Sequence, residues 1–553
     1  MSNQKKQSFL GGAVTLAFAA AIVKVLGAIY KIPFGNIVGS EGQTYFDVGY
    51  RIYNILLTIS TAGLPLAISR LTSQAQAQGR ENEKRKIFRT AIWLFFALGL
   101  IGSLLMFFQA DWLAGLMNEP LGFWPIRALS PAVFCVCLLA CIRGYTQGQG
   151  NMVPTAISQV IEVVCKLFVG LALAWYFLSL SMSVDRVAAG AILGVTVGEI
   201  VALLFLIFYL LSHRTPSHSL DVPESSGTLM KKILAIGIPI TLSNSAMSII
   251  NVVDTSIVLG RLRDIPELAA DAATLYGQYS FGMNLINLPP SFVYPVTMSL
   301  IPFAAAALSR KDSAQADRIV SSAFRIIAVL TIPMGAGLSV LGGPILKMLY
   351  PLQQADAEAA APHMQILGIA CVFICLMSLT NVILQTYGKE LIPICTVIAG
   401  GITKVVLNYF LVGNPGINIY GAPISTLCCY LVIVALNLFF VWKYSPQKPR
   451  YLQIFAKPVA AAVLMGGAAW AVFGFASRLL DGVFLSLAQQ LSTDPERIQF
   501  LARYLTNAAS TLLGIFVGVV VYAILIVALR ILRAEDVRSM PRGEKLIKLL
   551  HLK

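Results

Sequence analysis

Long apolar runs dominate this sequence and leave few folds open to it. Fourteen stretches of about 20 residues or more carry few charges, and each is long enough to cross a bilayer as a helix. In lipid the backbone polar groups must be satisfied within the segment, which favours helices. The sequence therefore predicts an all-α polytopic membrane protein with about 14 transmembrane helices. The expected spans are residues 9–32, 45–70, 87–109, 123–146, 153–178, 187–211, 230–259, 274–308, 319–349, 363–387, 391–412, 420–442, 453–477 and 503–532.

The distribution of charge gives the expected topology. The chain has 553 residues, of which 12% are charged, whereas soluble domains have about 25%. A net charge of +15 could suggest nucleic acid, but most Lys and Arg lie in the N-terminus, in alternate loops and in the C-terminal tail. That asymmetry follows the positive-inside rule. We therefore expect no nucleic-acid partner, and a multi-pass protein of the cytoplasmic membrane with both termini in the cytoplasm.

A repeated motif indicates an internal duplication, as transporters often show. A pattern of Gln, Gly and Lys recurs at an offset of 238 residues: Gln147, Gly150 and Lys166 match Gln385, Gly388 and Lys404. Both copies run in the same direction, so the repeat is parallel. The sequence therefore predicts an N-lobe of six helices (residues 1–220), a C-lobe of six helices (221–445), and two further helices with a basic cytoplasmic tail (446–553).

Two further patterns concern helix geometry. Three glycines spaced by four over residues 190–198 predict a ridge at which a neighbouring helix approaches closely. Four prolines in residues 289–302 predict a break in the eighth span. A hinge is the favoured interpretation of that break, and a static kink is the alternative.

Two cations within the first spans suggest an anion site. An Arg near the middle of a membrane helix costs roughly 2.5–3.5 kcal/mol and usually faces a bundle interior or a wet cavity. Lys24 and Arg51 lie at similar depth in consecutive spans, while Lys31 and Asn54 keep the same region polar. We predict a cavity-facing anion site, and the alternative is that the two long side chains snorkel to the membrane surface.

The remaining ionisable residues in the spans are candidates for coupling or structural charges. Glu162 and Lys166 have the i, i+4 spacing of a helical ion pair. Such a pair could take part in coupling or could be a self-neutralised structural pair, and the sequence favours neither. Lys404 has no local carboxylate, so it needs a partner or loses its proton. Its candidate partner is Asp254, with Asn408 one turn further along the same helix. Glu199 is a further candidate whose orientation the sequence leaves open.

Motifs of catalysis and metal binding are absent from the sequence. There is no Walker-type glycine loop, HExxH or GxSxG motif, and the nine Cys show no CxxC spacing. The loops on the external side are too short for a catalytic domain. We expect a transporter rather than an enzyme, with no metal and no cofactor, and coupling to an ion or to the membrane potential is left open.

The opening of the chain carries a family resemblance. Residues 12–71 resemble the start of bacterial stage V sporulation protein B and its relatives. These are lipid-linked saccharide exporters of the multidrug/oligosaccharidyl-lipid/polysaccharide superfamily, which includes the lipid II flippases of Gram-positive bacteria. The run Tyr-Arg-Ile-Tyr-Asn at 50–54 is similar to the Phe-Arg-Ile-Pro-Asn of those flippases, in which the arginine lines the central cavity. The resemblance implies a MATE-like fold of two six-helix lobes plus two C-terminal helices.

The resemblance also implies a function. It indicates a flippase for undecaprenyl-pyrophosphate-linked saccharide, such as the lipid II peptidoglycan precursor, that works as a monomer among membrane lipids by alternating access. Lys24 and Arg51 would hold the pyrophosphate. An arginine that the relatives carry in helix eight is Asn284 here, so the cavity is less cationic. The alternative is a MATE-type multidrug or cation antiporter, which would favour acids in the first helices, yet helix one offers Lys24 and no acid. A membrane enzyme is a third class.

Overall fold

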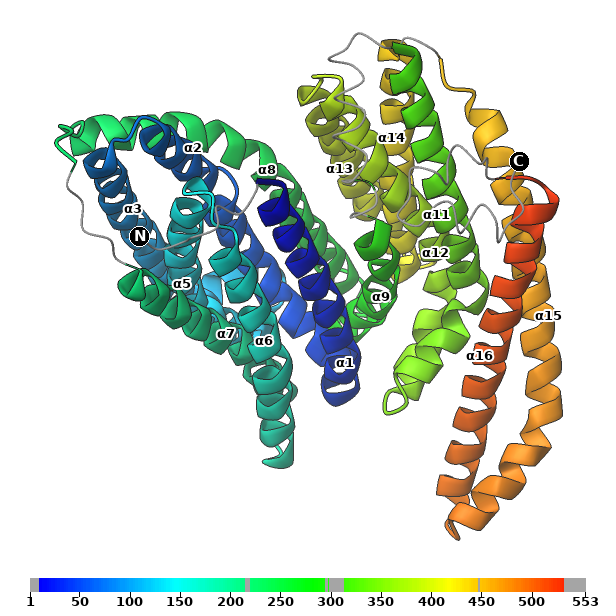
Figure 1. The fold of residues 1–553 in the computed structure, drawn as a ribbon. Coiled ribbons are helices and arrows are strands. Elements are labelled where there is room, and N and C mark those ends of the chain that lie inside the picture. Colours follow the sequence, from blue (N-terminus) through cyan, green and yellow to red (C-terminus); the bar gives the residue numbers. More distant parts are fainter. Residues whose placement is uncertain (1–8, 214–218, 294–296, 298–312, 446–447, 532–553) are drawn as a thin grey trace. The chain divides into compact units, whose positions relative to one another are not determined.

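The structure is a computed structural model that describes residues 9–213, 219–293, 297, 313–445 and 448–531 (Figure 1). Within these residues all regular structure is helical, which confirms the predicted all-α class. In the described parts of the chain, twelve helical segments are long and apolar enough to cross a membrane. The first, Phe18–Ala77, overlaps two predicted spans, and the other eleven each overlap one. The remaining predicted span, 274–308, lies partly outside the described residues.

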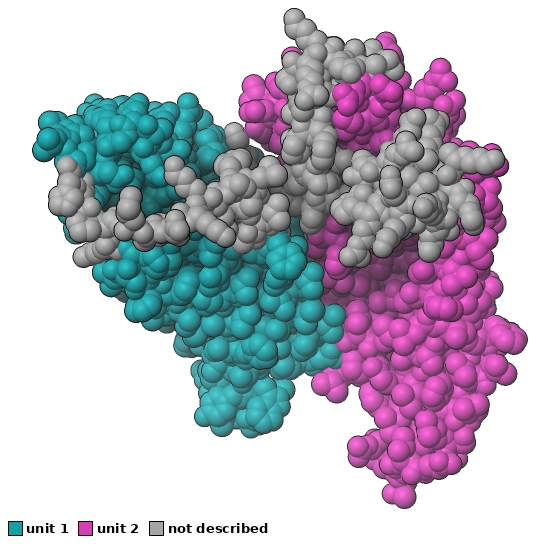
Figure 2. Space-filling view, viewed as in Figure 1, with its two compact units in different colours: residues 1–277 teal, residues 278–553 magenta. Residues whose placement is uncertain are grey.

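The chain forms two compact units, Met1–Gly277 and Gln278–Lys553, which Figure 2 shows in different colours. This grouping follows contacts between helices. The predicted lobes, 1–220, 221–445 and 446–553, rest on the sequence repeat and stay a prediction.

Unit 1 is a bundle of long helices joined by short loops. In it α6 packs against α7, α5 packs against α3 and α7, and α1 packs against α5, α6 and α8. Its elements are α1 (Phe9–Thr61), α2 (Leu64–Ala77), α3 (Glu81–Phe108), α4 (Ala110–Leu116), η1 (Pro120–Gly122), α5 (Phe123–Gly148), α6 (Val153–Ser179), α7 (Val184–Ser212), α8 (Ser226–Arg263) and the first part of α9 (Ala272–Ile286).

The first two predicted spans meet without a loop between them. Within α1 only Gly39 leaves the helical conformation, with φ of 70°, so α1 consists of two helices joined at a kink. The second of these ends at Thr61 and α2 begins at Leu64, so the helix is interrupted at residues 62–63 within the predicted span 45–70. Pro65 lies in the first turn of α2, where its missing N–H costs nothing, and so favours a new helix there. Gly63 allows close packing, because a Cβ there would lie 2.0 Å from the carbonyl oxygen of Gly237.

The glycine ridge on α7 packs against α6, as predicted. A Cβ on Gly194 would lie 2.4 Å from the Cα of Gly170, and one on Gly198 would lie 2.6 Å from the carbonyl oxygen of Glu162. Real Cβ contacts do not come this close, so only glycine fits at these two positions. The close approach brings the polar residues of α6 next to those of α7.

Unit 2 contains the remaining helices. Its main contacts are between α11 and α12, between α13 and α14, and between α15 and α16, which form a long hairpin (Figure 1). The elements are the end of α9, α11 (Ser313–Leu349), α12 (Gln354–Thr386), α13 (Leu391–Val412), η2 (Asn418–Tyr420), α14 (Gly421–Tyr444), α15 (Tyr451–Leu491) and α16 (Pro495–Ala528).

The described residues bear on both the predicted proline break and the predicted repeat. Helix α9 ends at Ile286, with a turn residue at Asn287 just before Pro289. Pro295 and Pro302 lie outside the described residues, so the hinge stays a prediction.

In the repeated motif, Gly150 and Gly388 both adopt positive φ, 79° and 71°, in the loops that precede α6 and α13. The two copies therefore share a backbone conformation that glycine favours.

Candidate functional site

Arg51 lies on the second part of α1 and is only partly engaged. Its Nη2 donates a long hydrogen bond of 3.5 Å to the hydroxyl of Tyr276 on α9, and that hydroxyl also bonds Thr255 on α8 at 2.9 Å. Asp47 and Asp254 interact favourably with its charge. Within the described residues, however, the Nε of Arg51 is buried without a hydrogen-bond partner. The guanidinium therefore has a donor available for an anion.

The other residues predicted for the anion site have different surroundings. Lys31 forms an ion pair with Asp47 at 3.4 Å, so part of its charge is already balanced. Lys24 is exposed on α1, and Asn54 is half-buried one turn beyond Arg51. Asn284 is half-buried on α9 and belongs to unit 2. Of the predicted group, the structure thus brings Lys31 and Arg51 into one electrostatic cluster around Asp47.

A polar cavity of about 580 Å³ lies inside unit 1. Helices α1, α5, α6 and α7 supply its polar walls, although most residues of these helices are apolar. The polar lining consists of Tyr50, Tyr53, Thr61, Arg143, Gln147, Thr155, Gln159, Glu162, Lys166 and Glu199. The cavity therefore contains two of the residues predicted as coupling or structural charges, Glu162 and Lys166.

The ion pair in this cavity is not the one predicted from spacing. Glu162 pairs with Arg143 of α5 rather than with Lys166 on its own helix. The Nε of Arg143 also donates to Ser158 at 2.9 Å, which orients the guanidinium toward α6. The i, i+4 pairing was wrong because a guanidinium from the neighbouring helix reaches the carboxylate. Sequence reasoning missed Arg143, although it is an ionisable residue within a predicted span, the same signal that identified Arg51.

Lys166 is surrounded by aromatic rings. Its Nζ lies 4.6 Å from the ring centroid of Tyr50, 4.9 Å from that of Tyr30 and 5.7 Å from that of Phe46. The negative faces of such rings attract an ammonium group. Lys166 can therefore keep its charge in the bundle without a carboxylate in direct contact.

Glu199 of α7 is a second acid in the lining. It is buried, and it accepts a hydrogen bond of 3.0 Å from the hydroxyl of Tyr53. It lines the cavity, which settles a question that the sequence left open. Two acidic and two basic side chains thus line one cavity.

The residues of unit 2 predicted as coupling or structural charges lie on α13. Lys404 and Asn408 are both buried one turn apart, and Asn408 accepts a short hydrogen bond from Ser425 of α14. Asp254 is buried on α8 in unit 1. Its predicted pairing with Lys404 therefore joins residues of different units and stays a prediction.

A neutral network in unit 2 occupies the positions of the charged network in unit 1. Asn437 donates to Asn381 at 2.8 Å and to Thr380 at 3.0 Å, and accepts from Thr396 at 2.8 Å. The repeat offset is 238, from Gln147 to Gln385 (385 − 147). At that offset Arg143 corresponds to Asn381, Ser158 to Thr396 and Glu199 to Asn437. In unit 1 Arg143 joins α5 to α6, whereas in unit 2 Asn437 joins α14 to α12 and α13, so the matched positions differ both in chemistry and in the helices they connect.

Comparison with known proteins identifies the family. The model of the polysaccharide biosynthesis protein family matches residues 9–308, more than half of the chain. The chain belongs to this family. The model of the MatE family also matches residues 239–410. Membership of the polysaccharide biosynthesis protein family confirms the resemblance drawn from residues 12–71.

The similarity to individual proteins extends over most of the chain. Stage V sporulation protein B of Bacillus subtilis (strain 168) is 23% identical over 98% of this chain and 99% of its own length. Lipid II flippase MurJ of the same organism is 23% identical over 80% of this chain and 84% of its own length. A solved structure of lipid II flippase MurJ in an inward closed conformation has a TM-score of 0.63 at 15% identity, covering 93% of this chain and 99% of that one. The predicted polytopic fold is confirmed, and the chain is a multi-pass membrane protein.

Proposed function

We propose that this chain is a flippase or exporter that moves a polyprenyl-pyrophosphate-linked saccharide, such as a lipid II-like precursor, across the cytoplasmic membrane by alternating access. One relative is named as a lipid II flippase. That name describes a transporter, in agreement with the expectation that this chain is not an enzyme. The observation that supports the proposal most directly is that the buried guanidinium of Arg51 has unused hydrogen-bonding capacity. In the described part of the chain no carboxylate lies within ion-pair distance of its guanidinium, and its Nε is buried without a partner.

Pyrophosphate suits this group chemically. A guanidinium presents donors in a planar fork that matches phosphate oxygens, and charge-assisted bonds of this kind are stronger than neutral ones. Lys31 is engaged with Asp47, so Arg51 is the residue proposed to bind the pyrophosphate first, and a contribution of the exposed Lys24 stays a prediction. The parallel repeat supports alternating access, because transporters of this kind rock one repeat against the other.

A second candidate function is a multidrug or cation antiporter. Glu162 and Glu199 line the cavity of unit 1, and carboxylates in a low-dielectric cavity attract cationic ligands. The match of the MatE family model to residues 239–410 also supports this candidate. Against it, Arg143 already pairs with Glu162, and Lys166 adds a further cation to the same cavity.

Transport in liposomes tests the proposal. The purified protein is reconstituted, and the flipping of labelled lipid II is compared with the uptake of a cationic dye. We expect lipid II transport by the wild type, its loss in Arg51→Ala, and partial activity in Arg51→Lys, because an ammonium lacks the planar fork. Arg127→Ala is the matched control: its Nε is likewise buried without a hydrogen-bond partner in the described residues, but its guanidinium lies over the rings of Phe107 and Phe123, at 4.8 and 4.6 Å.

Three outcomes contradict the proposal. Normal lipid II transport by Arg51→Ala shows that Arg51, the central residue of the proposal, is not needed for transport. Equal loss in Arg127→Ala shows that the effect is not specific to the anion site. Dye uptake without lipid II transport favours the antiporter. Thermal stability of the same preparations is measured in parallel, and a melting temperature that falls together with activity in Arg51→Ala assigns Arg51 a structural role.

A further inference from the structure

A second pocket in unit 1 is basic and lies at the start of α3. It has a volume of about 600 Å³. Arg85, Lys86, Arg89 and Trp93 of α3 form one wall, with 85, 89 and 93 one turn apart on a helix face. Pro223 and Ser226, at the start of α8, form part of the opposite wall. Three cations therefore share one opening with an aromatic side chain.

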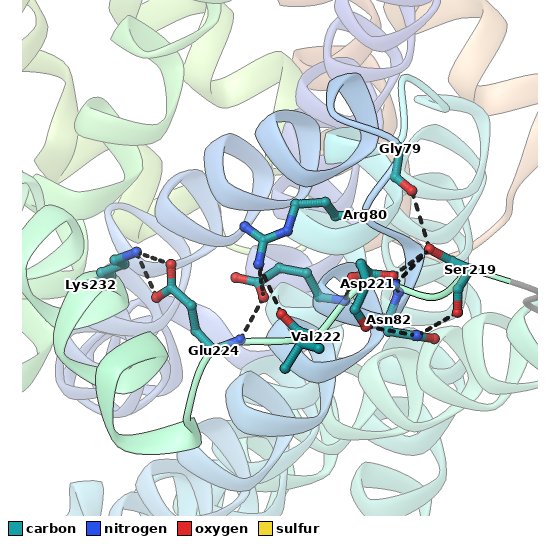
Figure 3. Close-up of polar contacts among 9 residues, drawn as sticks. Gly79, Arg80, Asn82, Ser219, Asp221, Val222, Glu224 and Lys232 are labelled. Carbon is teal, nitrogen blue, oxygen red and sulfur yellow. Dashed lines mark hydrogen bonds and ion pairs between the residues drawn. The ribbon is translucent and has the colours of Figure 1, made fainter.

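The segment that forms the opposite wall is fixed to α3 by hydrogen bonds (Figure 3). The carboxylate of Asp221 accepts from the backbone amides of Asn82 at 3.0 Å and of Glu83 at 2.9 Å, so it caps the first turn of α3. The side chain of Asn82 donates to the carbonyl oxygen of Ser219 at 2.8 Å. Glu83 in turn accepts from the backbone amide of Glu224 at 2.7 Å. The pocket therefore has two fixed walls.

Among the described residues, the acids around the pocket do not neutralise Lys86 and Arg89. Three acids near it are paired with cations outside its lining: Glu83 with Arg80 at 3.0 Å, Glu81 with Lys84 at 2.6 Å, and Glu224 with Lys232 at 2.6 Å. Within the described residues Lys86 and Arg89 form no ion pair with a carboxylate. The opening therefore keeps a positive potential, which selects an anion.

The surface of α3 below the pocket is apolar, which identifies the kind of anion. Trp93 is 71% exposed, and Ile101, two turns further along, is 64% exposed. Phe96, Leu100 and Leu104 are also exposed along α3. Trp is enriched at membrane interfaces, where its amphipathic ring lies at headgroup level. A phosphate in the pocket would thus sit above a path for hydrocarbon chains.

We propose that this pocket binds the phosphate headgroup of an anionic membrane phospholipid, whose acyl chains lie along the exposed apolar side of α3. Basic pockets beside transmembrane helices recognise such headgroups. The lipid is a bound ligand and not the transported substrate, so the inference does not depend on the proposed function.

Lipid titration of the purified full chain tests this site. Phosphatidylglycerol is added in detergent, and bound lipid is counted by native mass spectrometry while the melting temperature is followed. Phosphatidylcholine with the same acyl chains and inorganic phosphate are the comparison ligands. We expect phosphatidylglycerol to bind and to raise the melting temperature, and both comparison ligands to do neither. In Arg85→Gln/Lys86→Gln/Arg89→Gln its affinity should fall on the order of 100-fold, as expected for about 1 kcal/mol per cation.

Two further variants make the result specific. Lys443→Gln/Lys448→Gln/Arg450→Gln removes the same charge from the region of Trp442, over which the Nζ of Lys448 lies at 3.8 Å, and it leaves the pocket intact. It should bind phosphatidylglycerol like the wild type. Ser226→Glu places a carboxylate in the pocket at a helix start, where an acid favours helix formation. It should therefore weaken lipid binding even if the triple variant of α3 fails to fold.

Each opposite result overturns the inference. Equal losses in the two triple variants show that total charge, and not the pocket, attracts the lipid. Binding by Ser226→Glu at wild-type affinity excludes the pocket as the site. Displacement of the lipid by inorganic phosphate at similar concentration shows that the ligand is free phosphate.

Discussion

The ion pair between Arg143 and Glu162 allows a quantitative test of the cavity in unit 1. The change is Arg143→Met, which replaces the guanidinium side chain by a shorter, unbranched apolar one and removes its charge. Glu162 is then left next to Glu199 without its direct counterion, and the hydrogen bond of 2.9 Å to Ser158 is lost. The expected result is a large loss of stability, because a carboxylate remains in a mostly buried cavity.

The magnitude follows from burial. Removing one partner of a buried ion pair costs about 3–5 kcal/mol. The side chains of Arg143 and Glu162 are 10% and 19% exposed, so water reaches them in part. We therefore expect the lower end of that range, about 3 kcal/mol in the free energy of unfolding. The double variant Arg143→Met/Glu162→Met replaces the pair by apolar side chains, and it should lie within about 1 kcal/mol of the wild type.

Unfolding of the purified protein by titration with SDS measures these differences. Lys166→Met is the matched control, because it removes a cation from the same cavity that is held by aromatic rings, and it should cost at most about 2 kcal/mol. The reasoning is refuted if Arg143→Met costs less than about 1 kcal/mol. It is also refuted if the double variant is as unstable as Arg143→Met, since the pair would then carry no coupling energy.

Two further predictions concern helix ends and helix contacts. Desolvation acts to raise the pKa of Asp221, but hydrogen bonds from Ser219 and from the first amides of α3 outweigh it, so this pKa is lowered. The stability that Asp221 contributes is therefore present above a pH of about 3.9 and is lost as the pH falls through the lowered pKa. Asp221→Asn should be less stable than the wild type at neutral pH and should show less acid dependence, and equal melting curves from pH 3 to pH 7 (about the range of this titration) would contradict this. Gly194→Ala should cost about 1–3 kcal/mol by overpacking against Gly170, whereas Gly467→Ala, with no atom within 4 Å of its new Cβ, should be neutral; SDS unfolding of both variants decides.

The helices could be predicted from the sequence because their cause is local. An apolar run of sufficient length must satisfy its own backbone in lipid, and this holds whatever its neighbours are. The break at residues 62–63 also had a local signal, Gly63 followed by Pro65, but the apolar run continued through it and hid the end of the helix. The ridge over residues 190–198 was predicted correctly, because small residues at that spacing have few other uses.

The partners of charged side chains could be predicted only in part. The rule that a charge within a span faces the interior selected Arg51, Glu162 and Lys166, and these lie within the bundle of unit 1. It could not say that Arg143 would displace Lys166 as the partner of Glu162. That choice depends on how closely α5 and α6 approach, which helical spacing does not contain. The proposed role of Arg51 in binding substrate stays a prediction.

Charged groups in the first copy of the sequence repeat are replaced by amides in the second. This replacement affects how the matched positions respond to pH and to ion concentration. Arg143 and Glu199 in unit 1 correspond to Asn381 and Asn437 in unit 2, and the amides of this second pair hydrogen bond to each other at 2.8 Å. An amide neither gains nor loses a proton, and its bonds respond little to dissolved ions. A change in acidity or in local ion concentration therefore acts on the charged groups at the first pair of positions and not on the hydrogen bond between Asn381 and Asn437. At these two positions a side chain that can change its protonation is therefore found in the first copy of the sequence repeat and not in the second.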